Sequence, residues 1–146
     1  MRLSRLTPTI VGFIFLYAGI YKLITPVQAI AALTSIGFST SISLALVCLI
    51  TVIELHLGIT LTTRLDLRFS LIAAITVLFT FSLFLFVLST MANPPSCGCM
   101  GLGEIFRSSR HNAMFGLLRN CALMWLLSAG YSYYCRAAPP GLVYEI

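Results

Sequence analysis

Residues 69–91 read FSLIAAITVLFTFSLFLFVLSTM, an apolar stretch without a charged side chain. A helix needs about 20 apolar residues to cross the hydrocarbon core of a bilayer, and this stretch is long enough. Because backbone polar groups in lipid must be hydrogen-bonded internally, only helices or a closed barrel can span a membrane. The stretch lacks the strict alternation of apolar and polar residues that a barrel strand requires, so it predicts a transmembrane helix.

The composition of the whole chain agrees with this interpretation. The 146 residues are 59% hydrophobic and 9% charged, with a mean hydropathy of +1.00, which excludes an ordinary soluble protein. The length suits one domain over residues 1–146. The net charge of +5 comes from basic residues near the ends of apolar segments. Such residues are typical of topology signals and lipid headgroup contacts, so no nucleic-acid partner is predicted.

Three further segments are long and apolar enough to span the bilayer. The predicted helices cover residues 6–24, 42–62, 69–91 and 112–135, and the fold class is all-α, an integral membrane four-helix bundle. The first segment resembles a signal peptide but has no small-residue cleavage site, so we expect it to be retained. The short connection 63–68 predicts that the second and third spans are antiparallel neighbours. Residues 25–41 have near-helical apolar spacing, which indicates a short helix in the outer interface.

The basic residues predict the orientation of the bundle. One end would carry five of them and the other end three, namely Arg2, Arg5, Arg64, Arg68 and Arg136 against Lys22, Arg107 and Arg110. The positive-inside rule then puts both termini in the cytoplasm. The polar connection between the third and fourth spans faces outward, into the periplasm of a Gram-negative bacterium. We therefore expect a multi-pass protein of the bacterial inner membrane.

That outward connection contains Cys97-Gly98-Cys99, between two prolines and two further glycines. The prolines cannot continue the preceding helix, so the cysteines should lie on a tight, irregular loop. Two cysteines separated by one residue close a strained disulfide, and strained disulfides are the ones that exchange. Oxidising compartments are also where disulfides persist. Two interpretations stay open: a redox-active pair that exchanges with the cysteine of a partner, and a static cross-link.

A soft-metal clamp is a third interpretation of the loop. Cys97, Cys99, Met100 and His111 have the donor atoms that Cu(I) or Zn²⁺ prefers. The sequence has no second Cys-x-x-Cys and no spaced histidine pair. We therefore predict no metal site.

Two more cysteines lie inside predicted spans. Cys48 and Cys121 fall about two helical turns below the outer ends of the second and fourth spans, at similar depth. Each is a candidate resolving thiol that would pass electrons inward from the loop pair. Buried cysteines are also common as small apolar side chains, and this packing role is the interpretation we favour.

Glu54 lies near the middle of the second predicted span, where an unpaired charge is costly. Arg119 on the fourth span is the expected ionic partner, Asn120 can complete the hydrogen bonds, and Gly58 allows another helix to approach closely. The cluster is either a proton or quinone-headgroup site or an interhelical clamp, and we favour the clamp. Lys22 is included in this polar membrane site, although we expect its side chain to extend to the headgroups or to lower the pKa of the loop thiols.

Four elements occur in a familiar order along the chain: residues 17–23 (YAGIYKL) with Pro26, Glu54 with Gly58, Cys97-Gly98-Cys99-Met100-Gly101, and Arg119-Asn120. Together they resemble the MauE family of methylamine utilisation membrane proteins, within the wider DoxX-like group. The resemblance covers essentially the whole chain. Family members usually have phenylalanine at the position of Met100.

The resemblance implies an inner-membrane protein that works with a periplasmic thioredoxin-like partner to mature the disulfide-rich small subunit of methylamine dehydrogenase. The chain would then act as a thiol-disulfide oxidoreductase through Cys97 and Cys99. MauE-like domains also occur away from methylamine genes, so the client does not follow from the resemblance. The arrangement is also similar to DsbB and vitamin K epoxide reductase, which makes quinone a cofactor by analogy alone.

A function of another class competes with disulfide exchange. The chain would then be a non-catalytic small subunit that stabilises or anchors a larger membrane complex, and its loop cysteines would form only a fixed cross-link. The phenylalanine-rich third span suits a partner helix as well as lipid. A fixed disulfide under every redox condition would favour this alternative.

Overall fold

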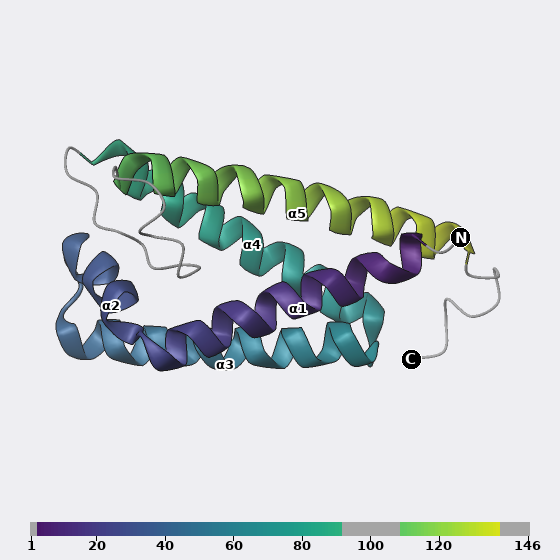
Figure 1. Ribbon diagram of the computed structural model, residues 1–146, viewed down its shortest axis with the longest axis horizontal. Coiled ribbons are helices and arrows are strands. Elements are labelled where there is room, and N and C mark those ends of the chain that lie inside the picture. Colours follow the sequence, from purple (N-terminus) through teal and green to yellow (C-terminus); the bar gives the residue numbers. More distant parts are fainter. Residues whose placement is uncertain (1–2, 92–108, 138–146) are drawn as a thin grey trace.

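The structure, a computed structural model, describes residues 3–91 and 109–137, and every regular element in those ranges is a helix (Figure 1). Their bounds are α1 Leu3–Ile24, α2 Pro26–Ser35, α3 Thr40–Thr63, α4 Leu67–Thr90 and α5 Ser109–Ala137. The long helices α1, α3, α4 and α5 each contain an apolar stretch long enough to cross a bilayer. The predicted all-α architecture of four spans is confirmed, and the chain is a multi-pass membrane protein.

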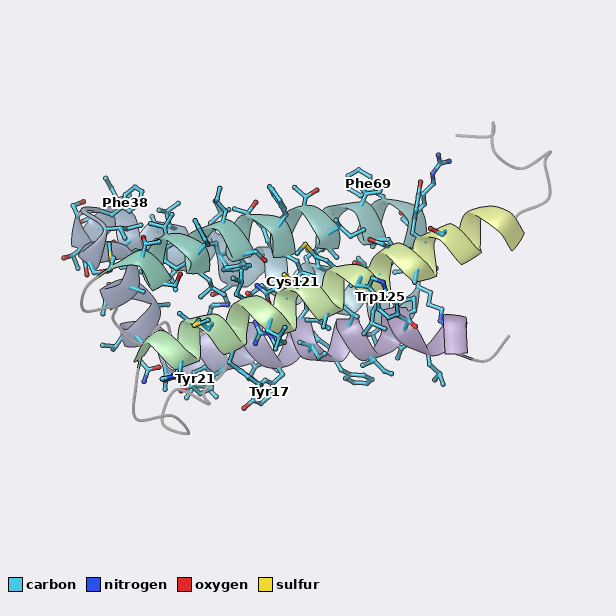
Figure 2. The ribbon with its side chains drawn as sticks, turned by 90° about the horizontal axis from the view of Figure 1, so that it is seen from above. Tyr17, Tyr21, Phe38, Phe69, Cys121 and Trp125 are labelled. Carbon is cyan, nitrogen blue, oxygen red and sulfur yellow. The ribbon has the colours of Figure 1, made fainter. Side chains whose placement is uncertain are left out.

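Large apolar side chains cover the outside of this bundle, as a protein surrounded by lipid requires. Phe69 is 78% exposed and Tyr17 is 53% exposed, and both project away from the helices (Figure 2). Inside, leucines from several helices form the main apolar core, among them Leu57, Leu71 and Leu127. The bundle therefore has apolar residues on both its inner and its outer surfaces, and its few buried polar groups stand out.

The helices pack as two pairs, with α1 against α3 and α4 against α5 (Figure 1). Gly58 is the reason that α1 and α3 approach so closely: a Cβ atom at this position would lie 2.7 Å from Cγ of Leu16. The close approach predicted at Gly58 is thus present, and α1 is the helix that uses it. Farther along α1, a Cβ at Gly19 would lie 2.9 Å from Leu55. As the residue numbers in α1 increase, the residue numbers of the contacting positions in α3 therefore decrease. The two helices are antiparallel.

The short turn after α3 has the form that a tight reversal needs. Arg64 and Asp66 both adopt positive φ angles, 62° and 44°, and the chain returns at once into α4. The predicted antiparallel order of α3 and α4 is therefore present. Away from the turn the two helices diverge, because each packs more extensively on another helix (Figure 1).

Helix α3 is longer than the part of it that α1 covers. Since Gly19 lies against Leu55, the end of α1 reaches only the middle of α3, and residues 40–50 continue for about 15 Å beyond it. Helix α2 packs along this extension (Figure 1). Its Ala32 and Leu33 are buried, so the predicted short helix is present and covers part of the bundle. The last turn of α1 consequently lies among other helices.

Candidate functional site

A buried ion pair joins α1 to α3. Nζ of Lys22 donates a hydrogen bond to Oε1 of Glu54, and the two residues are only 5% and 3% exposed. The expectation that Lys22 extends to the headgroups is wrong. That expectation assumed that the end of α1 lies at the membrane surface. In the structure this end, which carries Lys22, lies against the middle of α3. A lysine at this depth needs a partner, and Glu54 provides it.

The expected ionic partner, Arg119, makes hydrogen bonds to its neighbour in the chain. Its Nε and Nη2 donate to Oδ1 of Asn120, at 3.2 and 2.9 Å. Asn120 is 1% exposed, and Arg119 and Glu54 line the same small cavity. The structure therefore brings together all four predicted residues of the polar membrane site, with Lys22 in the position that the sequence suggested for Arg119. Two cations and one carboxylate give the cluster one net positive charge.

These four residues line a small cavity between α1, α3, α4 and α5, with a volume of about 30 Å³. Two polar atoms of the cluster, Oε2 of Glu54 and Nδ2 of Asn120, are buried without a hydrogen-bond partner among the residues described. A cavity of this size admits a water molecule, which can donate to Oε2 and accept from Nδ2. The cluster can thus hold a small polar molecule inside an apolar bundle.

Phe81 of α4 is a member of this site that the sequence analysis did not single out. Nζ of Lys22 lies 5.0 Å from the centroid of its ring, within the range of a cation–π interaction. The Phe81 side chain and Lys22 also line a second, larger cavity on the α2 side of the cluster. One phenylalanine among several in an apolar span has no distinguishing signal in the sequence, because its role depends on how α4 is rotated.

Four of the five cysteines fall into two groups. Cys97 and Cys99, the predicted catalytic pair, lie outside the described residues, as does Met100. Cys48 of α3 and Cys121 of α5 are free and exposed on the bundle surface, on helices that are not paired with each other. Figure 2 shows Cys121 on the outer side of the bundle. The buried packing role that we favoured is therefore wrong for both residues, because each thiol is exposed on the outside of the bundle and neither lines the polar cavity. Their role as resolving thiols stays a prediction.

The histidines are apart from the site as well. His56 and His111 are exposed, and His56 points to a different face of α3 from Glu54. In residues 3–91 and 109–137 no group of three metal-ligating side chains comes together. The described part of the site therefore consists of an ion pair, an arginine–asparagine contact and an aromatic ring.

Comparison with known proteins adds one finding to this geometry. Residues 1–133 match the family model described as "Methylamine utilisation protein MauE", and the matched region contains all five helices except the end of α5. No curated protein and no solved structure matches the chain. Since the family model spans nearly the whole of a four-span bundle in which Glu54, Arg119, Asn120 and Lys22 converge, this chain belongs to the MauE family.

Proposed function

We propose that this protein exchanges disulfides with a thioredoxin-like partner on the periplasmic side of a bacterial inner membrane, through Cys97 and Cys99. In the exchange, a thiolate of the partner attacks the Cys97–Cys99 disulfide and forms a mixed disulfide. The second thiol of the partner then attacks that bond, which leaves the partner oxidised and the loop as a dithiol. The two electrons and two protons of the partner's thiols are transferred to the loop, so the step balances.

The observation that supports this proposal most directly is where α4 ends and α5 begins. Met91 and Ser109, the described residues on either side of the cysteine-bearing segment, lie at the end of the bundle that carries α2 (Figure 1). The turn with Arg64 and Arg68 lies at the opposite end, where α1 begins and α5 ends. Because α4 ends and α5 begins at this end of the bundle, we infer that the cysteines between them face the α2 side of the membrane.

The buried Lys22 strengthens the orientation on which the proposal depends. A lysine paired with Glu54 inside the bundle is no longer a topology signal at the α2 end. The remaining count is five arginines at one end, Arg2, Arg5, Arg64, Arg68 and Arg136, against Arg107 and Arg110 at the other. The positive-inside rule then favours a periplasmic α2 end more strongly than the sequence count alone did.

The MauE family description connects the chain to methylamine utilisation. We therefore propose that the ultimate client is the disulfide-rich small subunit of methylamine dehydrogenase, reached through the thioredoxin-like partner. In this scheme the ion pair between α1 and α3 and the contact between Arg119 and Asn120 act as the rigid polar floor of the bundle below the loop.

The experiment is to trap the mixed disulfide. The wild-type chain and the Cys97→Ser and Cys99→Ser variants are each produced with a thioredoxin-like partner whose second cysteine is replaced by serine, and adducts are identified by non-reducing electrophoresis and mass spectrometry. We expect the wild-type loop to accumulate a mixed disulfide, because the partner thiol that would release it is absent. The two serine variants cannot form the loop disulfide that the partner attacks, so they should accumulate much less of it. Cys48→Ser and Cys121→Ser are the matched controls and should behave as wild type.

Two results would overturn the proposal. One is a Cys97→Ser/Cys99→Ser double variant that matures the client normally and forms no adduct. The other is a Cys97–Cys99 disulfide that persists under every redox condition while the protein co-purifies stoichiometrically with subunits of a larger complex. The second result would identify the chain as a non-catalytic stabilising subunit.

A further inference from the structure

The larger cavity lies between α2, α3 and α4, and its volume is about 410 Å³. Pockets that bind small molecules usually measure about 300–1,000 Å³ and are mostly apolar with a few fixed polar groups. This cavity has that character. Its polar lining residues are Lys22, Thr76 and Thr80, and the remaining lining side chains are aliphatic or aromatic.

Among the polar lining residues, Lys22 is the one that can donate a hydrogen bond to a ligand. The hydroxyls of Thr76 and Thr80 donate to the carbonyl oxygens of Ile72 and Thr76, both at 3.0 Å. The ammonium of Lys22 has three N–H donors, and its one hydrogen bond among the described residues goes to Glu54. A buried ammonium is costly unless its donors are satisfied. An acceptor atom on a ligand in the cavity would satisfy a second donor.

The rest of the lining restricts what the ligand can be. Three phenylalanines, Phe38, Phe81 and Phe84, line the cavity, and aromatic side chains favour a flat ring as a neighbour. A phosphate headgroup carries a negative charge, and a buried charge is costly unless a counter-charge pairs with it. Here the lining contains one cation, and it already pairs with a carboxylate. A neutral carbonyl oxygen, which needs one donor, fits this cavity better.

A quinone has these properties: its ring is flat, carries carbonyl oxygens and dissolves in the membrane. We propose that the cavity between α2, α3 and α4 binds the ring of a membrane quinone, with one ring carbonyl accepting a hydrogen bond from Nζ of Lys22. The ring lies beside Phe81, and the apolar tail follows the aliphatic side chains of α2 and α3. The proposal goes beyond disulfide exchange and does not depend on Cys97 or Cys99.

The first experiment fills the cavity. The full-length protein is reconstituted in phosphatidylcholine nanodiscs, and binding of decylubiquinone is measured by isothermal titration calorimetry. Ala29 lines the cavity, whereas Ala31, on the same helix, is exposed and does not. We expect Ala29→Phe to weaken binding about tenfold or more, since a ring of added volume occupies the ligand's place, and Ala31→Phe to leave it unchanged. Equal binding by wild type and Ala29→Phe, or no saturable binding by wild type, would overturn the proposal.

The second experiment asks whether the carbonyl matters. Decylbenzene has a comparable ring and tail but no acceptor oxygen, so it reports an apolar cleft that accepts any acyl chain. We expect wild type to bind decylubiquinone about tenfold or more tightly than decylbenzene, which matches one hydrogen bond to a charged donor. The Lys22→Met/Glu54→Gln variant should lose that preference. Equal affinity of wild type for the two probes would mean a lipid cleft and would contradict the proposal.

Two checks keep these results interpretable. If Lys22→Met/Glu54→Gln does not fold, as judged by circular dichroism, the matched alanine pair on α2 decides the question. The Cys97→Ser variant should bind decylubiquinone as wild type does. Loss of the mixed disulfide with retained quinone binding would remove the proposed exchange function alone, and the reverse pattern would remove the quinone site alone.

Discussion

Gly58 of α3 faces the backbone of Leu16 in α1 so closely that a Cβ atom at position 58 would lie 2.9 Å from the amide nitrogen of Leu16. Small residues at such crossings let transmembrane helices gain close packing, which is a main source of their association energy. The same crossing holds Lys22 within hydrogen-bonding reach of Glu54, one turn away from Gly58 on α3. The ion pair and the glycine contact therefore depend on each other.

Gly58→Ala should destabilise the bundle. The added methyl group meets backbone and side-chain atoms of Leu16 that cannot move without shifting α1, so we expect a cost of about 1–3 kcal/mol. Thermal unfolding in detergent measures the change. Gly130→Ala is the matched control, because a Cβ at this position would lie 3.9 Å from Cγ2 of Thr7, an ordinary van der Waals contact, and alanine favours the helix. A Gly58→Ala protein as stable as Gly130→Ala would contradict the close crossing.

Lys22→Met should cost about 3–5 kcal/mol of stability, because it leaves the Glu54 carboxylate buried without its cation. Adding Glu54→Gln should recover much of this loss, since no unpaired charge then remains. A double-mutant cycle that uses both single variants and the double variant measures the coupling between the two side chains. Additive effects would show that the two residues do not form the pair described above.

Asn120→Ala should destabilise the protein by about 1–3 kcal/mol, because the Nε and Nη2 groups of Arg119 lose the oxygen that accepts from both. The matched control is Ser128→Ala on the same helix, an exposed serine that only donates to the carbonyl of Met124. Its stability should stay within about 0.5 kcal/mol of wild type. Chemical denaturation in mixed micelles compares the two variants, and equal effects would contradict the role of Asn120.

Labelling with a membrane-impermeant maleimide should divide four of the five cysteines into two classes. In reduced, intact cells we expect Cys97 and Cys99 to react, whereas Cys48 and Cys121 stay unlabelled because their spanning helices put them in lipid. Variants that each keep one cysteine separate the sites, and mass spectrometry reads the labels. All should react after the protein is unfolded in detergent. Failure of both Cys97 and Cys99 to react would reverse the proposed orientation.

The positions of the helices could be predicted well from the sequence, and the contacts between them less well. Uninterrupted apolar runs such as residues 69–91 fix where spans lie, because the bilayer sets their length. Hydropathy does not say which spans touch or how each is rotated. For that reason Glu54 could be recognised as a buried group that needs a cation, while its hydrogen-bonded partner proved to be Lys22.

The depth of Lys22 in the membrane was also predicted wrongly from the sequence, because its side chain lies deeper than the end of a span would suggest. Counting residues from the end of α1 puts Lys22 at the membrane surface only if all spans begin and end at the same level. Here α3 extends past α1, and α2 packs along the extension. The signal was available in part: residues 25–41 have helical apolar spacing, and a helix that needs an apolar contact has to pack on something.

The pairing of Lys22 with Glu54 has a consequence for how the chain enters its membrane. During synthesis α1 emerges well before α3, so for a time its lysine has no counter-charge. We expect the insertion machinery to retain α1 until α3 arrives and to release the two as a hairpin, since only together do the charges of Lys22 and Glu54 neutralise each other. An acidic residue in the second span would then govern the integration of the first.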